Sequence, residues 1–146
     1  MLIVRPASVA EVRGVQMQVL RPRGPLPGDR PFTADWRHLA ALRNGEVIGA
    51  CSLGPAPWPR ADLAQPPPPQ WQFRSLAVLP AHRGGVGSAL VAAATGLATD
   101  EGVGSLWATA RVAALSLYER QRWQVVGPEW DKPGVGPHKY VIRLIR

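Results

Sequence analysis

Cysteine is almost absent from this chain of 146 residues, which contains Cys51 alone. A single cysteine cannot form an internal disulfide, and it cannot build a cysteine-rich zinc site. A domain of this length buries about two-thirds of its unfolded surface, so it can fold on its hydrophobic core without such crosslinks. The sequence therefore predicts one domain over residues 1–146, in a reducing compartment such as the cytoplasm.

Long hydrophobic runs are missing as well. No stretch reaches the roughly 20 apolar residues that span a membrane, and residues 1–8 have the wrong charge order for a signal peptide. No membrane partner is therefore expected. The three histidines, His38, His82 and His138, have no metal-ligand spacing between them, so the sequence predicts no metal site.

Acidic residues are few, with 10 Asp and Glu against 17 Lys and Arg, and the formal net charge is +7. Such a surface attracts anions, including nucleic acid and phosphorylated cofactors. The arginines are scattered from Arg5 to Arg146 and never form a run of five, so a dedicated nucleic-acid surface is not expected. Two interpretations of the excess charge remain, an ordinary solvated surface rich in arginine and a set of local anion sites.

Apolar spacing and turn residues predict the order of helices and strands. Ser8 and Glu11 form a capping box that starts a helix over about 9–20, and Asn44-Gly45 predicts a two-residue hairpin turn. Proline and glycine interrupt residues 21–36 and 54–69, and the second stretch is expected to be a rigid surface loop. Together these two loops are expected to build the pocket of the acceptor. Further strands are expected at 2–5, 38–43, 46–53, 70–79, 105–110, 123–126 and 140–145, and further helices at 86–101 and 113–121. This order predicts an α/β fold, a mixed sheet covered by helices.

A glycine-rich loop between a strand and a helix is the clearest functional signal. The strand that ends at Pro80 is followed by Arg83, by glycines at 84, 85 and 87, and by an amphipathic helix. Glycines let the backbone turn sharply, while a helix start offers unpaired amide donors and a positive dipole end. This pattern predicts a phosphate-binding site with Arg83 at its rim. The spacing excludes a P-loop and a dinucleotide fingerprint, because no lysine follows the last glycine and the loop lies mid-chain.

These segments together resemble the GNAT superfamily of N-acetyltransferases. The strand Leu76-Ala77-Val78, the glycine loop and its helix match the family signature, as do the strand 107–111 and a following helix with a tyrosine. Residues 134–138 resemble the ElaA-like branch. The resemblance covers nearly the whole chain and implies a GNAT-like, mostly antiparallel twisted sheet, one acetyltransferase domain and acetyl-CoA as cosubstrate.

The resemblance also implies roles for individual residues. The backbone of the strand is expected to contact the pantetheine arm and the oxyanion, and the loop to hold the pyrophosphate. Tyr118 is expected to protonate the thiolate, because a phenol is protonated at neutral pH; the alternative is that it fills the core beside Trp123. Arg74 or Arg111 is expected to meet the 3′-phosphate or an acidic substrate group. The predicted coenzyme-binding residues are Leu76, Ala77, Val78, Arg83, Gly84, Gly85, Val86, Gly87, Ser88 and Arg111.

Two features depart from the family pattern. The glycine loop is one residue short, so the family's Arg/Gln position falls on either His82 or Arg83. Arg122 stands where the family often has glycine after the tyrosine helix, and a left-handed arginine there would cost about 1 kcal/mol. The first departure predicts weaker coenzyme binding, and the second an altered helix end.

The general base is not specified by the sequence. The strand before Leu76 carries Gln, Arg and Ser where many relatives have a glutamate. His138 has a suitable intrinsic pKa and is one candidate; a water chain is another, and a structural role for this histidine also stands. Cys51 is expected to be a core residue.

The expected acceptor is a small-molecule or protein amine, and a homodimer is left open. The alternative function is a non-catalytic module that binds acyl-CoA and acts in regulation or protein contact.

Overall fold

The computed structural model describes residues 1–145 as seven strands, three α-helices and two short 3-10 helices. The strands are β1 (Leu2–Ala7), β2 (Arg37–Arg43), β3 (Glu46–Pro55), β4 (Gln70–Val78), β5 (Ser105–Arg111), β6 (Gln124–Lys132) and β7 (Gly136–Leu144). The helices are α1 (Val9–Leu20), η1 (Pro80–His82), α2 (Val86–Asp100), η2 (Val112–Ala114) and α3 (Leu115–Glu119).

The strands are hydrogen-bonded in the order β1-β2-β3-β4-β5-β7-β6. The pairs β1–β2, β2–β3, β5–β7 and β6–β7 are antiparallel, and β4 and β5 are parallel over residues 70–72 and 105–107. The predicted α/β fold with a mixed, mostly antiparallel sheet and flanking helices is thus confirmed.

The chain divides into two compact units, and β4 and α2 each contribute to both. The first unit comprises Met1–Gly54 and Arg74–Ala94, and the second comprises Pro55–Phe73 and Thr95–Arg146. That residues 1–146 form one domain stays a prediction.

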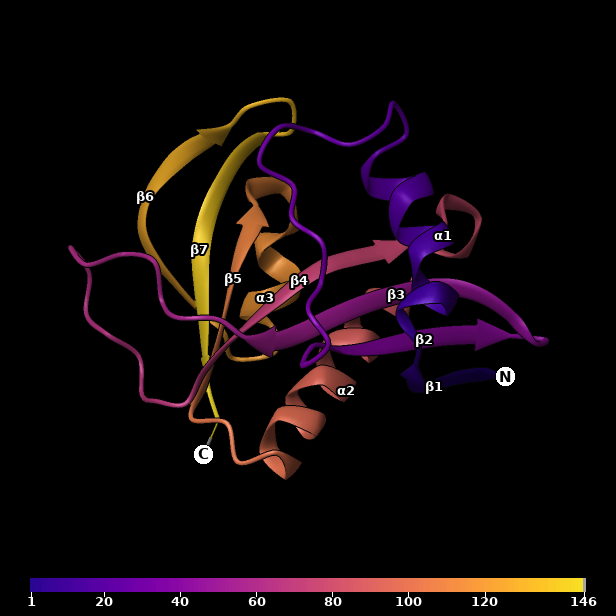
Figure 1. Cartoon of the computed structure of the whole chain (residues 1–146), viewed down its shortest axis with the longest axis horizontal. Coiled ribbons are helices and arrows are strands. Elements are labelled where there is room, and N and C mark those ends of the chain that lie inside the picture. Colours follow the sequence, from indigo (N-terminus) through magenta and orange to yellow (C-terminus); the bar gives the residue numbers. More distant parts are fainter. Residues whose placement is uncertain (146) are drawn as a thin grey trace. The chain divides into compact units, whose positions relative to one another are not determined.

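In the first unit, α1 begins with the predicted capping box. The Ser8 hydroxyl accepts a hydrogen bond from the Glu11 amide at 3.2 Å, and the Glu11 carboxylate accepts one from the Ser8 amide at 3.0 Å. Two unpaired backbone donors at the helix start are satisfied in this way. The helix lies across β2 and β3 (Figure 1). The buried residues of this contact are Val12, Val15, Ala40, Ala50 and Ala77.

The hairpin between β2 and β3 turns at Asn44-Gly45, as predicted, with φ values of 50° and 77°. Side chains alternate along β3, since successive strand residues point to opposite faces. Ser52 bonds to α1, whereas Cys51 lies 3.9 Å from a carbonyl oxygen of α2. A Cβ atom on Gly49 would stand only 3.1 Å from Val86. Within this unit, α1 and the first part of α2 therefore cover opposite faces of the strands.

In the second unit, the end of the proline-rich segment is fixed by hydrogen bonds. The Gly104 amide donates to the Pro69 carbonyl at 2.9 Å, and the Ser105 hydroxyl donates to the Pro67 carbonyl at 2.7 Å. A Cβ atom on Gly104 would stand 2.1 Å from the Pro68 carbonyl oxygen. Position 104 therefore has no room for a side chain.

The start of the same segment is packed into an aromatic cluster. Trp58 is buried and lies edge-on to Trp107 and Tyr140, with ring centroids 5.9 and 5.3 Å apart. The indole nitrogen of Trp107 donates to the Ala56 carbonyl at 2.9 Å. The expected surface loop is thus exposed in its middle but anchored in the core at both ends.

Strands β6 and β7 extend further than the sequence predicts. The sequence predicted a strand over 123–126, yet β6 continues through Gly127 and Pro128 to Lys132. Gly127 has φ 75°, and the register with β7 shifts between Val126 and Trp130. A bulge absorbs the extra residues, so these strand-breaking residues bend the strand without ending it.

No helix within residues 1–145 is long and apolar enough to cross a membrane. The same residues contain no group of three or more His, Cys, Asp or Glu side chains placed to hold a metal ion. The cytoplasmic location stays a prediction.

Candidate functional site

The glycine loop lies in the first unit between η1 and α2, and its residues 83–85 are exposed. Gly84 and Gly85 have φ values of 112° and 89°, a region that residues with a side chain rarely adopt. A Cβ atom on either glycine would meet nothing within 4 Å. Both positions therefore favour glycine because of their backbone conformation, and not because a side chain would lack space.

The start of α2 offers unpaired amide donors. The first hydrogen bond into the helix runs from the Ala89 amide to the Gly85 carbonyl at 3.0 Å. In the described part of the chain, the amides of residues 84–87 donate to no backbone carbonyl. Val86 is fully buried and fixes the helix start against the sheet. Together with the positive end of the helix dipole, these donors suit an anion.

Arg83 is the residue that opens the loop. Residues 80–82 form η1, which the His82 amide closes by donating to the Leu79 carbonyl at 2.9 Å. The Arg43 guanidinium lies 3.4 Å from His82 Nδ1, which can only accept this hydrogen bond. Of the two positions that the sequence left open, Arg83 is thus the exposed cation beside Gly84.

Leu76, Ala77 and Val78 follow a backbone irregularity in β4. Ser75 has φ 61°, which is uncommon for a residue other than glycine. The Gln16 side-chain amide donates to the Ser75 carbonyl at 3.2 Å and to the Ser52 hydroxyl at 3.0 Å. Gln16 and Ser52 are buried, so these bonds are shielded from water. Gln16 has no motif around it in the sequence that indicates this role.

The hydrogen-bond network continues from Ser52 to His38, which is also buried. His38 Nδ1 lies 2.8 Å from the Ser52 hydroxyl oxygen. Among the described residues, Nδ1 is the one acceptor within reach of the Ser52 proton, so the hydroxyl donates to Nδ1. Neutral His38 then carries its ring proton on Nε2. Burial lowers the pKa of His38, so the neutral form dominates at about pH 7.

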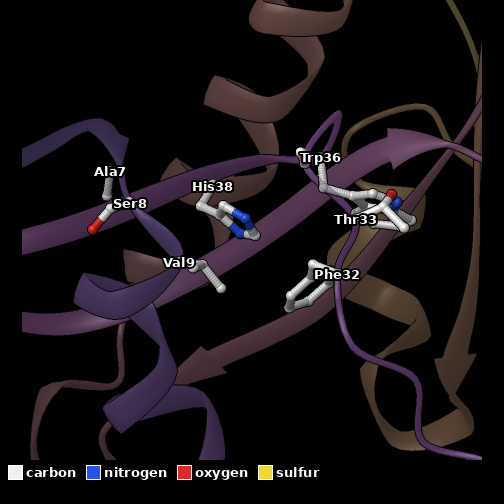
Figure 2. Close-up of a pocket in the computed structure, with 8 residues that line it drawn as sticks. Ala7, Ser8, Val9, Phe32, Thr33, Trp36 and His38 are labelled. Atoms are coloured by element: carbon white, nitrogen blue, oxygen red, sulfur yellow. The ribbon is translucent and has the colours of Figure 1, made fainter.

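His38 lines a pocket of about 450 Å³ in the first unit, and the loop 21–36, which was expected to help build the acceptor pocket, contributes part of its lining. Its ring lies between Val9 and Phe32, and Trp36 completes the aromatic wall (Figure 2). The two loop aromatics at 32 and 36 were the sequence signal that could have pointed to it. The lining residues are Ala7, Ser8, Val9, Phe32, Thr33, Ala34, Trp36 and His38.

Arg74 holds the loop that carries these aromatic residues. Its guanidinium lies 4.4 Å from the ring centroid of Phe32 and 5.0 Å from that of Trp36, and it donates to the Arg30 carbonyl. Burial lowers the pKa of Arg74. This arginine, expected to meet a phosphate or an acidic group, is engaged in holding the loop.

Tyr118 lies in α3, in the second unit, and only 5% of it is exposed. Its ring packs edge-on against Phe73 and Trp123, at centroid distances of 6.2 and 5.2 Å. This packing agrees with the expected alternative of a core tyrosine beside Trp123. Donation of its phenolic proton stays a prediction.

The helix that carries Tyr118 ends in a Schellman motif. The Trp123 amide donates to the Tyr118 carbonyl at 3.1 Å, and the Arg122 amide donates to the Glu119 carbonyl at 3.0 Å. Arg122 has φ 68°, so an arginine occupies the left-handed position that usually belongs to glycine. The helix therefore ends in the ordinary Schellman geometry and not in an altered one, but with arginine in the position that glycine usually occupies.

His138 and Arg111 are cross-strand neighbours in the second unit. His138 lies inside β7, between β5 and β6, and not before the last strand as the sequence suggested. Its Nδ1 donates to the Gly136 carbonyl at 2.8 Å, which leaves Nε2 as the hydrogen-bond acceptor of the neutral ring. Burial, and to a smaller extent Lys132 and Arg111, lower its pKa. The ring is thus neutral and packs 5.3 Å from the ring of Trp130.

The predicted site residues fall in both units. Residues 76–78 and 83–88 belong to the first unit, and Arg111, Tyr118 and His138 belong to the second. Cys51 is fully buried, and its burial raises the pKa of the thiol, so it is an inert core residue as predicted.

Comparison with known proteins agrees with these features. Residues 10–122 match the family model of the acetyltransferase (GNAT) family. The chain is 26% identical over 151 residues to YitI of Bacillus subtilis, described as an uncharacterized N-acetyltransferase, and the match covers 100% of this chain and 98% of YitI.

Solved structures share the fold. Escherichia coli ElaA has a TM-score of 0.75 and 18% identity, over 98% of this chain and 99% of ElaA. The yncA protein of Salmonella typhimurium, solved with its cofactor acetyl-CoA, has a TM-score of 0.70 and 19% identity, over 100% of this chain and 95% of yncA. With its family match over most of its length, this chain belongs to the GNAT acetyltransferase family.

Proposed function

We propose that this acetyltransferase moves an acetyl group from acetyl-CoA to an amine on a small molecule or a protein. The observation that carries the proposal is the pair of left-handed glycines, Gly84 and Gly85, beside amides without a backbone partner at the start of α2. A pyrophosphate with several oxygens suits such a group of donors. The yncA structure, which contains acetyl-CoA, supports this choice of ligand.

The remaining contacts with the coenzyme are assigned to residues that precede and follow the two glycines in the chain. Arg83 and Ser88 would meet the phosphates, and Arg111 would meet the 3′-phosphate. The backbone of residues 76–78 would hold the pantetheine arm and the oxyanion. The bond from Gln16 to Ser75 supports this assignment, because it fixes the backbone immediately before these residues.

The reaction needs one proton moved from the amine to the departing sulfur. The amine nitrogen attacks the thioester carbonyl carbon, a C–N bond forms and the C–S bond breaks. The products are an amide and free coenzyme A, once the thiolate is protonated. We propose Tyr118 as the acid. We propose His138 as the base. Its ring is neutral, and because Nδ1 donates to the Gly136 carbonyl, Nε2 keeps a lone pair that can accept the proton of the amine.

A second function is favoured by the burial of Tyr118. Its packing against Phe73 and Trp123 is typical of a structural side chain, and residues 70–75 contain no carboxylate. These observations favour a module that binds acyl-CoA without transferring the acyl group.

Ligand binding and turnover separate these functions. Millimolar acetyl-CoA should raise the melting temperature by several degrees, since ligand at 100 times its Kd stabilises a protein by about 2.7 kcal/mol. No rise would refute both functions. Release of free thiol on addition of candidate amines would establish transfer, and binding without release would establish the module.

Tyr118→Phe tests the acid directly, because it keeps the ring and removes the hydroxyl. We expect kcat to fall by roughly 100-fold or more while the coenzyme-induced rise in melting temperature is unchanged. An unchanged kcat would leave Tyr118 as a packing residue only.

A further inference from the structure

We infer that the pocket of Phe32, Trp36 and His38 is the acceptor subsite, and that it binds an aromatic or aliphatic body bearing a carbonyl oxygen. The inference rests on the proposed function and adds the class of acceptor to it. The reacting amine itself would lie outside this pocket.

The aromatic wall is held in place before any ligand binds. A Cβ atom on Gly54 would stand 2.5 Å from the Trp36 indole, so the indole lies directly on the strand backbone. Phe32 packs against Trp36 at a centroid distance of 5.2 Å and edge-on to His38 at 4.9 Å. Arg74 stacks on both aromatic rings. A preformed apolar wall of this kind binds a ring or an aliphatic group without a large ordering cost.

The pocket presents a histidine hydrogen-bond donor of fixed direction. His38 is 8% exposed, and its Nδ1 is occupied by the Ser52 hydroxyl. Gln16 orients that hydroxyl, since it donates to the same oxygen. The ring proton is therefore on Nε2, the nitrogen of His38 that remains for a ligand. A carbonyl oxygen of the acceptor is the natural partner.

The two hydroxyl groups of the lining, on Ser8 and Thr33, are already engaged. The Ser8 hydroxyl caps α1, and the Thr33 hydroxyl donates to Asp35. No carboxylate lines the pocket, and the Arg74 cation already stacks on the Phe32 and Trp36 rings, so the lining offers an ammonium group no anionic partner. The pocket suits the uncharged part of an acceptor and excludes its amine.

A continuous path of hydrogen bonds links this pocket to the coenzyme strand within the first unit. It runs from His38 to Ser52 at 2.8 Å, to Gln16 at 3.0 Å and on to the Ser75 carbonyl at 3.2 Å. Ser75 directly precedes residues 76–78, to which we assign the pantetheine arm. An acceptor seated on His38 is thus attached to the same rigid network as the thioester site.

Three amines probe the subsite: phenylalanine amide has a ring and a carbonyl, phenethylamine lacks the carbonyl, and glycinamide lacks the ring. Titration calorimetry without coenzyme should show phenylalanine amide binding at least about tenfold tighter than either of the others.

His38→Leu should abolish the preference over phenethylamine. His38→Gln, whose amide nitrogen can replace Nε2, should restore most of it. Phe32→Leu should reduce the preference over glycinamide and serves as a second test should His38→Leu fail to fold.

Equal binding of phenylalanine amide and phenethylamine to the native protein would overturn the inference, as would absence of binding by all three. So would an unchanged preference in a folded His38→Leu variant. Acetyl-CoA binding is measured separately by thermal shift on the same proteins. Loss of coenzyme binding with an intact amine preference would refute the proposed function, and the reverse result would refute the subsite alone.

Discussion

Gln16 and Ser75 are 59 residues apart in the chain, yet the Gln16 amide donates to the Ser75 carbonyl at 3.2 Å, where the β4 backbone is left-handed. Replacing Gln16 by Met would leave the Ser75 carbonyl and the buried Ser52 hydroxyl without their hydrogen-bond donor. We expect a loss of roughly 1–3 kcal/mol in the free energy of unfolding and a higher KM for acetyl-CoA. Urea unfolding and steady-state kinetics measure the two effects. The exposed Gln18→Met on the same helix is the control, and equal losses in both variants would contradict the role of Gln16.

Gly85→Ala and Gly96→Ala should have opposite effects on stability. Both sites have space for a methyl group, but Gly85 has φ 89° whereas Gly96 lies within α2. Alanine at 85 should cost about 1 kcal/mol and weaken the thermal shift with acetyl-CoA. Alanine at 96 should add about 0.5–1 kcal/mol and leave the shift unchanged. A stabilising alanine at 85 would show that the loop is not held in its left-handed form.

Arg122→Gly should stabilise the protein. Arg122 is exposed and has φ 68°, which costs an L-residue roughly 1–2 kcal/mol. Part of this gain is offset by the greater freedom of glycine in the unfolded chain, so we expect a net gain of about 1 kcal/mol or less in thermal or urea unfolding. Arg120→Gly is the control, because Arg120 is exposed and right-handed, with φ −62°. That variant should be destabilised, and a stabilising effect of both would point to surface charge instead.

Stability should fall between about pH 7 and pH 5. Burial lowers the pKa of both His38 and His138, so each binds a proton more readily in the unfolded chain. The stability that comes from keeping them neutral is present above the ordinary pKa of about 6.5 and is lost as the pH falls through the lower, folded value. Urea unfolding at a series of pH values should show this slope, and His138→Gln should reduce it. Parallel curves for the native protein and the variant would contradict the assignment.

Cys51 should resist thiol reagents in the folded protein. Its burial raises the pKa of the thiol, and the thiolate is the reactive form. Labelling with Ellman's reagent should be slow in buffer and complete within minutes in denaturing urea. Rapid labelling without denaturant would mean that the sheet opens locally at β3.

The elements that were predictable from the sequence depend on neighbouring residues. Ser8 and Glu11 are three positions apart and close a capping box, and Asn44-Gly45 are the two residues of a turn. The glycine loop is local in the same sense, because strand, loop and helix follow one another in the chain. The end of the predicted strand at Val126 was wrong, because a bulge lets β6 continue past Gly127 and this bulge depends on pairing with the distant strand β7.

The side chains from other elements that meet at the pocket were not predictable, for the opposite reason. His38, Ser52, Gln16 and Ser75 come from different elements, and each is an ordinary polar residue in its own segment. Arg74 likewise meets Phe32 only because the loop folds back onto the strand. Contacts between distant residues leave no periodic or compositional trace in a single sequence.

The tight approach of Gly104 to Pro68 has a practical consequence for engineering. Residues 66–69 and Trp58 are fixed, whereas Ala61 and Asp62 between them are exposed. A peptide tag or fluorophore inserted at Ala61-Asp62 would lengthen an exposed tip and would interrupt the surface ion pair of Arg60 with Asp62 and the turn from Arg60 to Leu63. An exposed ion pair contributes little to stability, and each doubling of that loop costs about 0.6 kcal/mol. This tip is therefore a suitable attachment point for a reporter in the binding experiments, whereas position 104 accepts no label.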